Sequence, residues 1–357
     1  MLISYGWSDA LQLAFASHSA PGLAPARVTV QQRGLYLLAT PEGEATARLS
    51  GRFAHAAADG DYPVAGDWVA AALRPQEGSA TIHHLIPRRS AFVRKAVGAG
   101  SASQVVAANV DVAFLVTSLN ADLNPRRIER YLATAWDSGA SPVIVLTKAD
   151  LCPGHERDPL QARIEAVALG VPVHAVSVFT GEGLDRLRES FAPGRTAALL
   201  GSSGAGKSSL LNALAGAPLM ATQAIREDDA HGRHTTTHRQ LVLLPDGRLV
   251  LDTPGMRELG LWEADAGVAA TFADIETLAR RCRFGDCAHA AEPGCAVQAA
   301  LAGGSLDRAR WRSWDKLRRE VAHAARKDDP QERAALRKVW VQRARHNRAR
   351  RRQEERE

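Results

Sequence analysis

The sequence predicts a multidomain protein in which a small all-β barrel or sandwich, an α/β domain and a mainly helical C-terminal domain follow one another. Three observations predict this order. Short β-like runs crowd residues 25–95, apolar strands then alternate with helical segments, and further helical segments flank three clustered cysteines. A chain of 357 residues is long enough for two or three domains. We expect their bounds at residues 1–98, 99–270 and 271–357.

The composition is typical of a soluble globular protein, with 45% hydrophobic residues and a mean hydropathy of −0.20. No apolar run approaches the roughly 18–20 residues that a transmembrane helix needs. The first residues lack a basic start and carry Asp9 within their apolar stretch, so we expect no signal peptide. These features predict a cytoplasmic protein with no membrane partner.

The all-β region has its short strands separated by Gly, Pro and Asp, as small barrels and sandwiches do. The runs are ARVTVQQRGLYLLAT, ATARLSG, GDWVAAALR and ATIHHLIPR. Trp68 could stack on nucleic-acid bases or pack in the core, and the cations near the end of the region are candidate phosphate contacts. These cations are Arg88, Arg89, Arg94 and Lys95. The Gly/Ala/Ser-rich stretch 97–109 predicts a connector to the next domain.

The α/β region begins with the apolar runs VDVAFLVTS and SPVIVLTK, which predict strands covered on both faces. Between them, residues 125–139 predict a helix with Pro125 near its start and Gly139 at its end. Four further strands are predicted at residues 171–177, 195–200, 239–244 and 248–253. This alternation predicts a doubly wound α/β domain.

A phosphate-binding loop follows one of these strands and opens a helix. Its pattern is Gly201-x-x-x-x-Gly206-Lys207-Ser208. Lys207 is expected to reach the β- and γ-phosphates, and the Ser208 hydroxyl to ligate Mg²⁺. A plain glycine-rich turn is the alternative. The expected nucleotide contacts are Gly201, Ser202, Ser203, Gly204, Ala205, Gly206, Lys207, Ser208 and Ser209.

Downstream, Asp252 ends an apolar strand in the sequence Asp252-Thr-Pro-Gly255. The carboxylate can hold Mg²⁺ through water, and the Gly255 N–H can sense the γ-phosphate. Between this motif and the phosphate loop, HGRHTTTHRQ offers a switch threonine for Mg²⁺, among Thr235, Thr236 and Thr237. An ordinary exposed loop remains the alternative for that stretch.

The base is read, on this interpretation, by Thr147-Lys148-Ala149-Asp150 at the end of a strand. The Asp150 carboxylate can accept hydrogen bonds from N1–H and the exocyclic amine of guanine, which adenine does not offer in that arrangement. Lys148 would pack along the ring, and Thr147 stands where Asn is usual. Backbone N–H groups of Ser177 and Val178 could contact the guanine carbonyl. A helix-starting turn is the alternative.

The order of these motifs is unusual, because the base-reading loop precedes the phosphate loop by about fifty residues. Base loop, backing loop, phosphate loop, switch and metal-binding Asp appear as a rotation of the usual GTPase order. A circular permutation retains the spatial contacts if the old termini lie close together. It also places the C-terminal junction just after Asp252–Gly255.

The cysteine cluster reads Cys282-x₄-Cys287-x-His289-x₅-Cys295. Three thiolates and an imidazole predict a closed tetrahedral zinc site of structural type. The alternative is reduced surface cysteines beside an unrelated histidine. Cys152 is expected to be an ordinary buried or partly buried thiol.

The positive charge is concentrated at the C-terminus. The chain has a net charge of +6, whereas residues 307–357 contain 18 Lys/Arg and 9 Asp/Glu, a balance of +9. Such a tail suits a polyanion, of which nucleic acid is the stronger candidate.

Together these motifs resemble the RsgA family, circularly permuted GTPases that assist late maturation of the small ribosomal subunit. The resemblance covers nearly the whole chain, through GSSGAGKSSL, GRHTTTHR, DTPGMRE, CRFGDCAHAAEPGCAV, the β domain and the permuted order. It implies an N-terminal OB-fold, a permuted P-loop GTPase domain and a zinc-bearing C-terminal domain. It further implies GTP/GDP, Mg²⁺ and Zn²⁺ as cofactors, and the small (30S) ribosomal subunit and its rRNA as partners. We expect a monomer.

The sequence offers no obvious residue to orient the attacking water, because Met256 stands where many GTPases carry a glutamine that does so. We expect slow intrinsic turnover that a bound partner accelerates, with His234 and His238 as candidate water-positioning residues or ordinary exposed histidines. An RNA-binding scaffold with a regulatory guanine-nucleotide site and little turnover is the alternative. A P-loop kinase or metabolic ATPase is disfavoured by Asp150.

Overall fold

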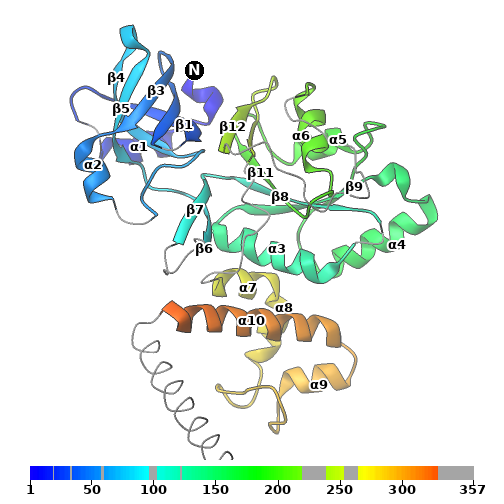
Figure 1. The fold of residues 1–357 in the computed structure, drawn as a ribbon. Helices are drawn as coiled ribbons and strands as arrows, with labels where there is room; N and C mark the ends of the chain where they lie inside the picture. Colours follow the sequence, from blue (N-terminus) through cyan, green and yellow to red (C-terminus); the bar gives the residue numbers. More distant parts are fainter. Residues whose placement is uncertain are drawn as a thin grey trace, which may run out of the picture.

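A computed structural model supplies the three-dimensional structure. It describes residues 1–18, 20–32, 34–57, 60–95, 103–120, 123–218, 239–252 and 264–328. An N-terminal β-barrel adjoins a central α/β domain, and a group of helices lies beneath the α/β domain next to helix α3 (Figure 1). Among the described helices, none is both long and apolar enough to cross a lipid bilayer.

The barrel is closed by five strands in the order β1-β2-β3-β5-β4, with β4 pairing back onto β1. All pairs are antiparallel except β3 with β5, and this is the OB-type arrangement that the family resemblance implies. The strands are β1 (Leu23–Gln32), β2 (Leu35–Thr40), β3 (Gly43–Leu49), β4 (Trp68–Arg74) and β5 (Ser79–Leu85). Short helices accompany them: η1 (Leu2–Tyr5), α1 (Asp9–Ala16), α2 (Gly51–Ala56) and η2 (Pro75–Glu77).

Two side chains predicted as candidate nucleic-acid contacts, Trp68 and Arg88, are instead engaged in contacts within the protein. Trp68 is only 1% exposed and packs edge-on against Trp7, so the base-stacking interpretation is wrong. Arg88 forms an ion pair of 2.8 Å with Asp67, which is fully buried. A buried carboxylate needs such a partner, and Arg88 therefore serves folding rather than phosphate contact.

The predicted connector at 97–109 is partly a strand. β7 (Ser103–Ala108) pairs with β6 (Ala91–Lys95) as an antiparallel hairpin. The predicted boundary at residue 98 falls between these two strands, and the domain bounds stay predictions. The stretch is rich in small residues, so its sequence lacks the clear alternation of polar and apolar side chains that indicates a strand. Its pairing with β6 identifies it as one.

The α/β domain has the predicted strands in the order β10-β9-β8-β11-β13-β12, all parallel except β12. Helices cover both faces of the sheet, α3 and α4 on one and α5 and α6 on the other (Figure 1). The strands are β8 (Val112–Ser118), β9 (Ser141–Thr147), β10 (Val173–Ala175), β11 (Thr196–Leu200), β12 (Arg239–Leu243) and β13 (Leu249–Asp252). The helices are α3 (Pro125–Ser138), η3 (Ala149–Leu151), α4 (Gly154–Glu165), α5 (Leu184–Glu189) and α6 (Lys207–Ala215).

Local chemistry explains these elements. Every residue of β8 is buried. Successive side chains point to opposite faces of the sheet, so that Phe114 packs in one core and Leu115 in the other. Helix α3 begins where the Asn124 side chain accepts the N–H of Arg126, and it ends at Gly139 with φ of +84°. The predicted doubly wound α/β domain is therefore confirmed.

The barrel and the α/β domain share one continuous sheet, because β1 also pairs with β12. Arg27 of β1 reinforces the junction, donating to the hydroxyl of Thr196 on β11 at 2.8 Å. Burial lowers the pKa of Arg27 to about 10, so the guanidinium stays charged at neutral pH. Strand β12 begins at Arg239, in the last two residues of the predicted switch stretch. The barrel therefore pairs with the strand into which that stretch leads.

The C-terminal helices are α7 (Asp265–Thr271), α8 (Ala273–Ala279), α9 (Ala296–Ala302) and α10 (Arg308–Asp328). Helix α7 crosses α3 closely at Gly267, where a Cβ atom would lie 2.0 Å from the Ala133 carbonyl oxygen. Beside this crossing, Arg310 of α10 is 5% exposed and pairs with Glu129 of α3 and Asp274 of α8. These contacts attach the C-terminal helices to the α/β domain.

Candidate active site and metal centre

The predicted phosphate loop lies between β11 and α6. Gly201 has a φ of +156°, and a Cβ atom there would lie 2.2 Å from the Val116 carbonyl oxygen, so no larger residue fits. Gly206 stands at the N-cap of α6 with a φ of +90°. Since glycine supplies no side-chain cap, the first N–H groups of α6 are directed at the space before the helix, where an anion is stabilised.

Lys207, the first residue of α6, extends its side chain back over the loop. Its ammonium donates hydrogen bonds to the carbonyl oxygens of Gly201 (2.8 Å) and Ser202 (2.5 Å). A cation is thereby held at the mouth of the loop, where negative phosphate oxygens gain most from it. Ser208 and Ser209 follow in the first turn of α6, and both are half-buried.

The base-reading loop leaves β9 and meets the phosphate loop. The buried Thr147 hydroxyl lies 2.7 Å from the carbonyl oxygen of Ala205, to which it donates, and 3.2 Å from that of Thr117. Lys148 follows with a φ of +60°, and Asp150 is exposed on the next turn. Two motifs that are 58 residues apart in sequence therefore form one surface.

The loop after β10 backs this surface. The Ala149 N–H donates to the Val176 carbonyl at 3.1 Å, which joins the two loops. Ser177 is fully buried; its N–H donates to the Glu182 carbonyl at 3.0 Å, and its hydroxyl accepts the N–H of Phe179 and Thr180. The Ser177 N–H that we predict to contact guanine is thus engaged inside its own loop, whereas Val178 is 38% exposed.

The predicted metal-binding Asp252 ends β13, which runs parallel to β11 and pairs through Leu251 and Ala198. The carboxyl ends of parallel strands lie at the same edge of a sheet. Asp252 at the end of β13 and Gly201 directly after β11 therefore lie at the same edge. Thr235, Thr236 and Gly255 lie outside the described residues. The same holds for Met256, His234 and His238.

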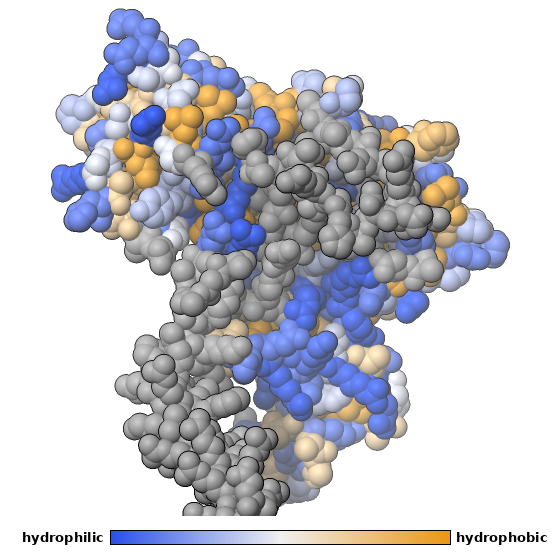
Figure 2. All heavy atoms as spheres, in the orientation of Figure 1, coloured by the Kyte–Doolittle hydropathy of each residue, from blue (hydrophilic) through white to orange (hydrophobic). Residues whose placement is uncertain are grey.

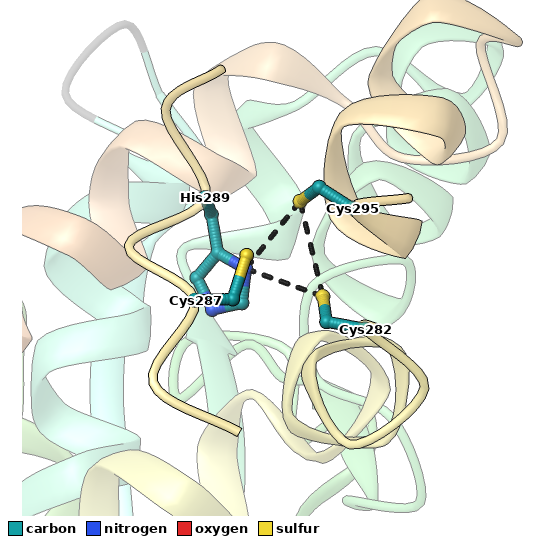
Figure 3. A group of neighbouring side chains, drawn as sticks. All are labelled: Cys282, Cys287, His289 and Cys295. Carbon is teal, nitrogen blue, oxygen red and sulfur yellow. Dashed lines mark hydrogen bonds between the residues drawn. The ribbon is translucent and has the colours of Figure 1, made fainter. Parts of the chain in front are cut away.

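A second cluster lies in the C-terminal helices, where Cys282, Cys287, His289 and Cys295 point toward one another (Figure 3). The Sγ atoms of Cys282 and Cys295 are 3.8 Å apart, and the Nδ1 of His289 lies 3.5 and 3.6 Å from them. A tetrahedral site with Zn–S bonds of about 2.3 Å separates its sulfur atoms by about 3.8 Å. The donor set therefore fits Zn²⁺, with all four ligand positions supplied by the protein.

Surrounding residues fix the His289 ring. Its backbone takes a positive φ of +57°, and the Gln298 side chain donates to its carbonyl oxygen. Trp311 and Trp314 both contact the ring edge-on. Burial, with the nearby Arg318 charge, lowers the pKa of His289, which favours the neutral imidazole that a metal binds.

The Cys295 thiol has a second role as the N-cap of α9, accepting the Gln298 N–H at 3.4 Å. The loop between Cys287 and Cys295 is stabilised by the Glu292 carboxylate, which accepts the N–H groups of Ala288, Ala290 and Ala291. This cluster thus organises α8, α9 and the loop between them. Cys152, as predicted, is a buried thiol elsewhere, 6% exposed.

Sequence reasoning missed the cations that hold these sites together. Arg310 and Arg27 each join segments more than 160 residues apart in sequence, and Arg157 reaches Glu182, 25 residues away. All three lie among many other arginines, and their partners follow only from the fold. An isolated arginine in a predicted strand, as Arg27 is in ARVTV, was the one available signal.

Comparison with known proteins gives a consistent result. Residues 85–262 match the family model described as RsgA GTPase. The chain is 47% identical over 349 residues to the small ribosomal subunit biogenesis GTPase RsgA of Opitutus terrae, covering 95% of each chain. It is 46% identical to the RsgA of Streptomyces coelicolor, covering 96% of this chain and 92% of that one.

Solved structures agree with the fold. The crystal structure of YjeQ from Thermotoga maritima superposes with a TM-score of 0.64 at 25% identity, covering 84% of this chain and 99% of the other. The structure of YloQ, described as a circularly permuted GTPase, superposes with a TM-score of 0.62 at 24% identity, covering 86% and 97%. The permuted order predicted from the motifs is therefore that of a known fold.

Proposed function

The chain belongs to the RsgA family of GTPases, and we propose that it hydrolyses GTP during late assembly of the small (30S) ribosomal subunit. The observation that carries this proposal is the contact of Thr147 with Ala205, which unites a base-reading loop and a phosphate loop in permuted order. The relatives named above are described as small ribosomal subunit biogenesis GTPases, which supports the proposal. As a member of this family the chain is a GTP hydrolase.

Guanine would be read by Asp150, with Lys148 along the ring and the loop of Ser177 and Val178 behind it. The phosphates would lie in the loop 201–209, against Lys207 and the N-terminus of α6. Ser208 and Asp252, with Thr235 or Thr236, would hold Mg²⁺, which neutralises phosphate charge when bound. Gly255 would sense the γ-phosphate.

Hydrolysis cleaves the bond between the β–γ bridging oxygen and the γ-phosphorus, as water adds to that phosphorus in line and releases GDP and phosphate. Lys207 and the loop N–H groups stabilise the charge that develops on the phosphate oxygens. Met256 has no group that can orient water. We therefore expect slow turnover by the isolated protein and faster turnover when the subunit completes the site.

RNA contacts are proposed for the two outer domains. Helix α10 presents exposed cations that phosphate groups would neutralise. Hydrophilic residues dominate its visible face (Figure 2). The exposed cations are Arg308, Arg312, Lys316, Arg318 and Arg319. On the barrel side, Arg89 is a predicted phosphate contact whose side chain is exposed. Its guanidinium also forms an ion pair with the Asp111 carboxylate at 3.5 Å. We take the protein to be a cytoplasmic monomer with domains at 1–98, 99–270 and 271–357.

The test is multiple-turnover hydrolysis of GTP and of ATP, with and without purified small ribosomal subunits. We expect GTP-selective turnover that rises at least tenfold with the subunit. Tight GTP binding without stimulated turnover would instead support a scaffold with a regulatory nucleotide site. The variant Lys207→Ala controls for contaminating hydrolases.

A further inference from the structure

Arg157 lies in the first turn of α4, directly after the base-reading loop, and its side chain reaches back toward that loop. One terminal nitrogen donates to the Ala149 carbonyl oxygen at 2.8 Å. The other donates to the Glu182 carboxylate at 2.5 Å. One guanidinium therefore binds two loops that leave different strands, β9 and β10.

The first contact, together with the Cys152 N–H that donates to the same oxygen at 3.2 Å, fixes the peptide unit that carries Asp150. The Ala149 carbonyl belongs to the same planar unit as the Asp150 N–H, so holding that oxygen sets the direction of the Asp150 Cα atom. Ala149 is fully buried, and its own N–H donates to Val176. Asp150 is exposed, and the direction of its carboxylate therefore depends on this backbone.

The second contact fixes the backing loop. The Glu182 carbonyl accepts the Ser177 N–H at 3.0 Å, and the Glu182 N–H donates to the Thr180 hydroxyl at 3.3 Å. Arg157 thus binds Glu182, whose backbone makes the hydrogen bonds to Ser177 and Thr180 that close the loop. A planar guanidinium can bond both partners at once, whereas a lysine ammonium at this position offers a single point of charge.

We propose that Arg157 is a positioning residue for guanine recognition, which sets the geometry of the Asp150 loop relative to the Ser177 loop. The proposal rests on the function proposed above, in which Asp150 reads the base. The alternative is an ordinary surface ion pair, since the Arg157 and Glu182 side chains are 24% and 49% exposed. Exposed pairs contribute little. The bond to the buried Ala149 carbonyl distinguishes the two cases.

The first experiment compares Arg157→Gln with Arg163→Gln, an exposed arginine on the same helix. The dissociation constant of fluorescent mant-GDP is measured, together with KM and kcat for GTP in the presence of small subunits. We expect Arg157→Gln to raise the dissociation constant and KM about tenfold with kcat unchanged, because base contacts are the same in ground and transition states. Arg163→Gln should stay within twofold of the wild type. An unchanged affinity in Arg157→Gln, or a loss confined to kcat, would overturn the proposal.

The second experiment separates positioning from general destabilisation. In an Asp150→Ala background the same Arg157→Gln change should alter KM less than twofold, since the group that it positions is gone. Arg157→Lys should recover part of the affinity. A tenfold effect that persists without Asp150 would show a structural role and overturn the proposal.

The two proposals can fail separately. If Asp150→Ala leaves mant-GDP affinity unchanged, the guanine assignment itself is wrong, and the positioning role falls with it. If Asp150→Ala weakens binding while Arg157→Gln does not, only the positioning role is wrong. Thermal unfolding without nucleotide confirms that each variant is folded.

Discussion

The hydroxyl of Thr147 donates a hydrogen bond to the carbonyl oxygen of Ala205 at 2.7 Å. Both residues are buried, and they belong to the base-reading loop and the phosphate loop respectively. Threonine thus supplies the link between these loops at a position where asparagine is usual. The link needs a single donor, which the threonine hydroxyl supplies.

The first prediction concerns this link. Thr147→Ala leaves the buried Ala205 carbonyl without its partner, a loss of about 1 kcal/mol or somewhat more. We expect the dissociation constant of GDP to rise about five- to tenfold in a fluorescence titration. Thr147→Ser keeps the hydroxyl and should remain within twofold of the wild type. Equal affinity in Thr147→Ala and Thr147→Ser would contradict the link.

The metal centre gives the second prediction. The purified protein should contain about one zinc per chain by atomic emission, and Cys287→Ser should lose it. Because Cys295 also caps α9, chelation should increase hydrogen exchange in α8 and α9 while leaving β8 and β9 protected. Cys152→Ser is the matched control and should retain zinc, since that thiol lies in the α/β core. Full zinc content in Cys287→Ser would exclude the assigned ligand set.

Arg310 leads to the third prediction. Its side chain is 6% exposed and pairs with Glu129, which is 0% exposed, at 3.1 Å. Removing one partner of a buried ion pair costs about 3 kcal/mol. Arg310→Met should therefore speed hydrogen exchange in α7, α8 and α10 by about a hundredfold. Arg319→Met, which removes an arginine whose side chain is 79% exposed, should leave exchange unchanged.

The same interface predicts a dependence on pH. Desolvation acts to raise the pKa of Asp274, but the hydrogen bonds and charge of Arg310 outweigh it, and the net pKa is below its ordinary value of 3.8. A carboxylate with a lowered folded-state pKa stabilises the fold above the unfolded-state pKa, and the benefit disappears as pH falls through the folded-state pKa. Urea unfolding should show wild type more stable than Asp274→Asn at pH 6, with the gap closing below about pH 4. A gap that widens on acidification would reverse the assigned sign.

Local signals in the sequence predicted the strands of the α/β domain, the phosphate loop and the metal-ligand cluster. Each depends on residues close together in the chain, such as the run around Phe114 or the spacing from Cys282 to Cys295. The five-stranded barrel was predicted only as a barrel or sandwich, and the family resemblance supplied the OB type. Its closure requires β4 to pair with β1, a contact that no local pattern specifies.

Contacts between distant segments were not predictable in the same way. The hydrophobic pattern places β1 in the barrel but does not show that its other edge pairs with β12. Arg88 follows a proline among other cations and resembles a phosphate contact until Asp67 is found beside it. The role of Arg310 depends on Glu129, and that of Arg157 on Glu182, and only folding brings each of these partners near.

The central claim is that one site, built from the Asp150 loop and the phosphate loop, selects guanine. The most direct measurement is calorimetric binding of GTP and ATP to the wild-type protein in the presence of Mg²⁺. A site whose carboxylate accepts hydrogen bonds from guanine should favour GTP by at least about a hundredfold. Equal affinity for GTP and ATP would contradict the assignment of Asp150 and with it the single guanine site.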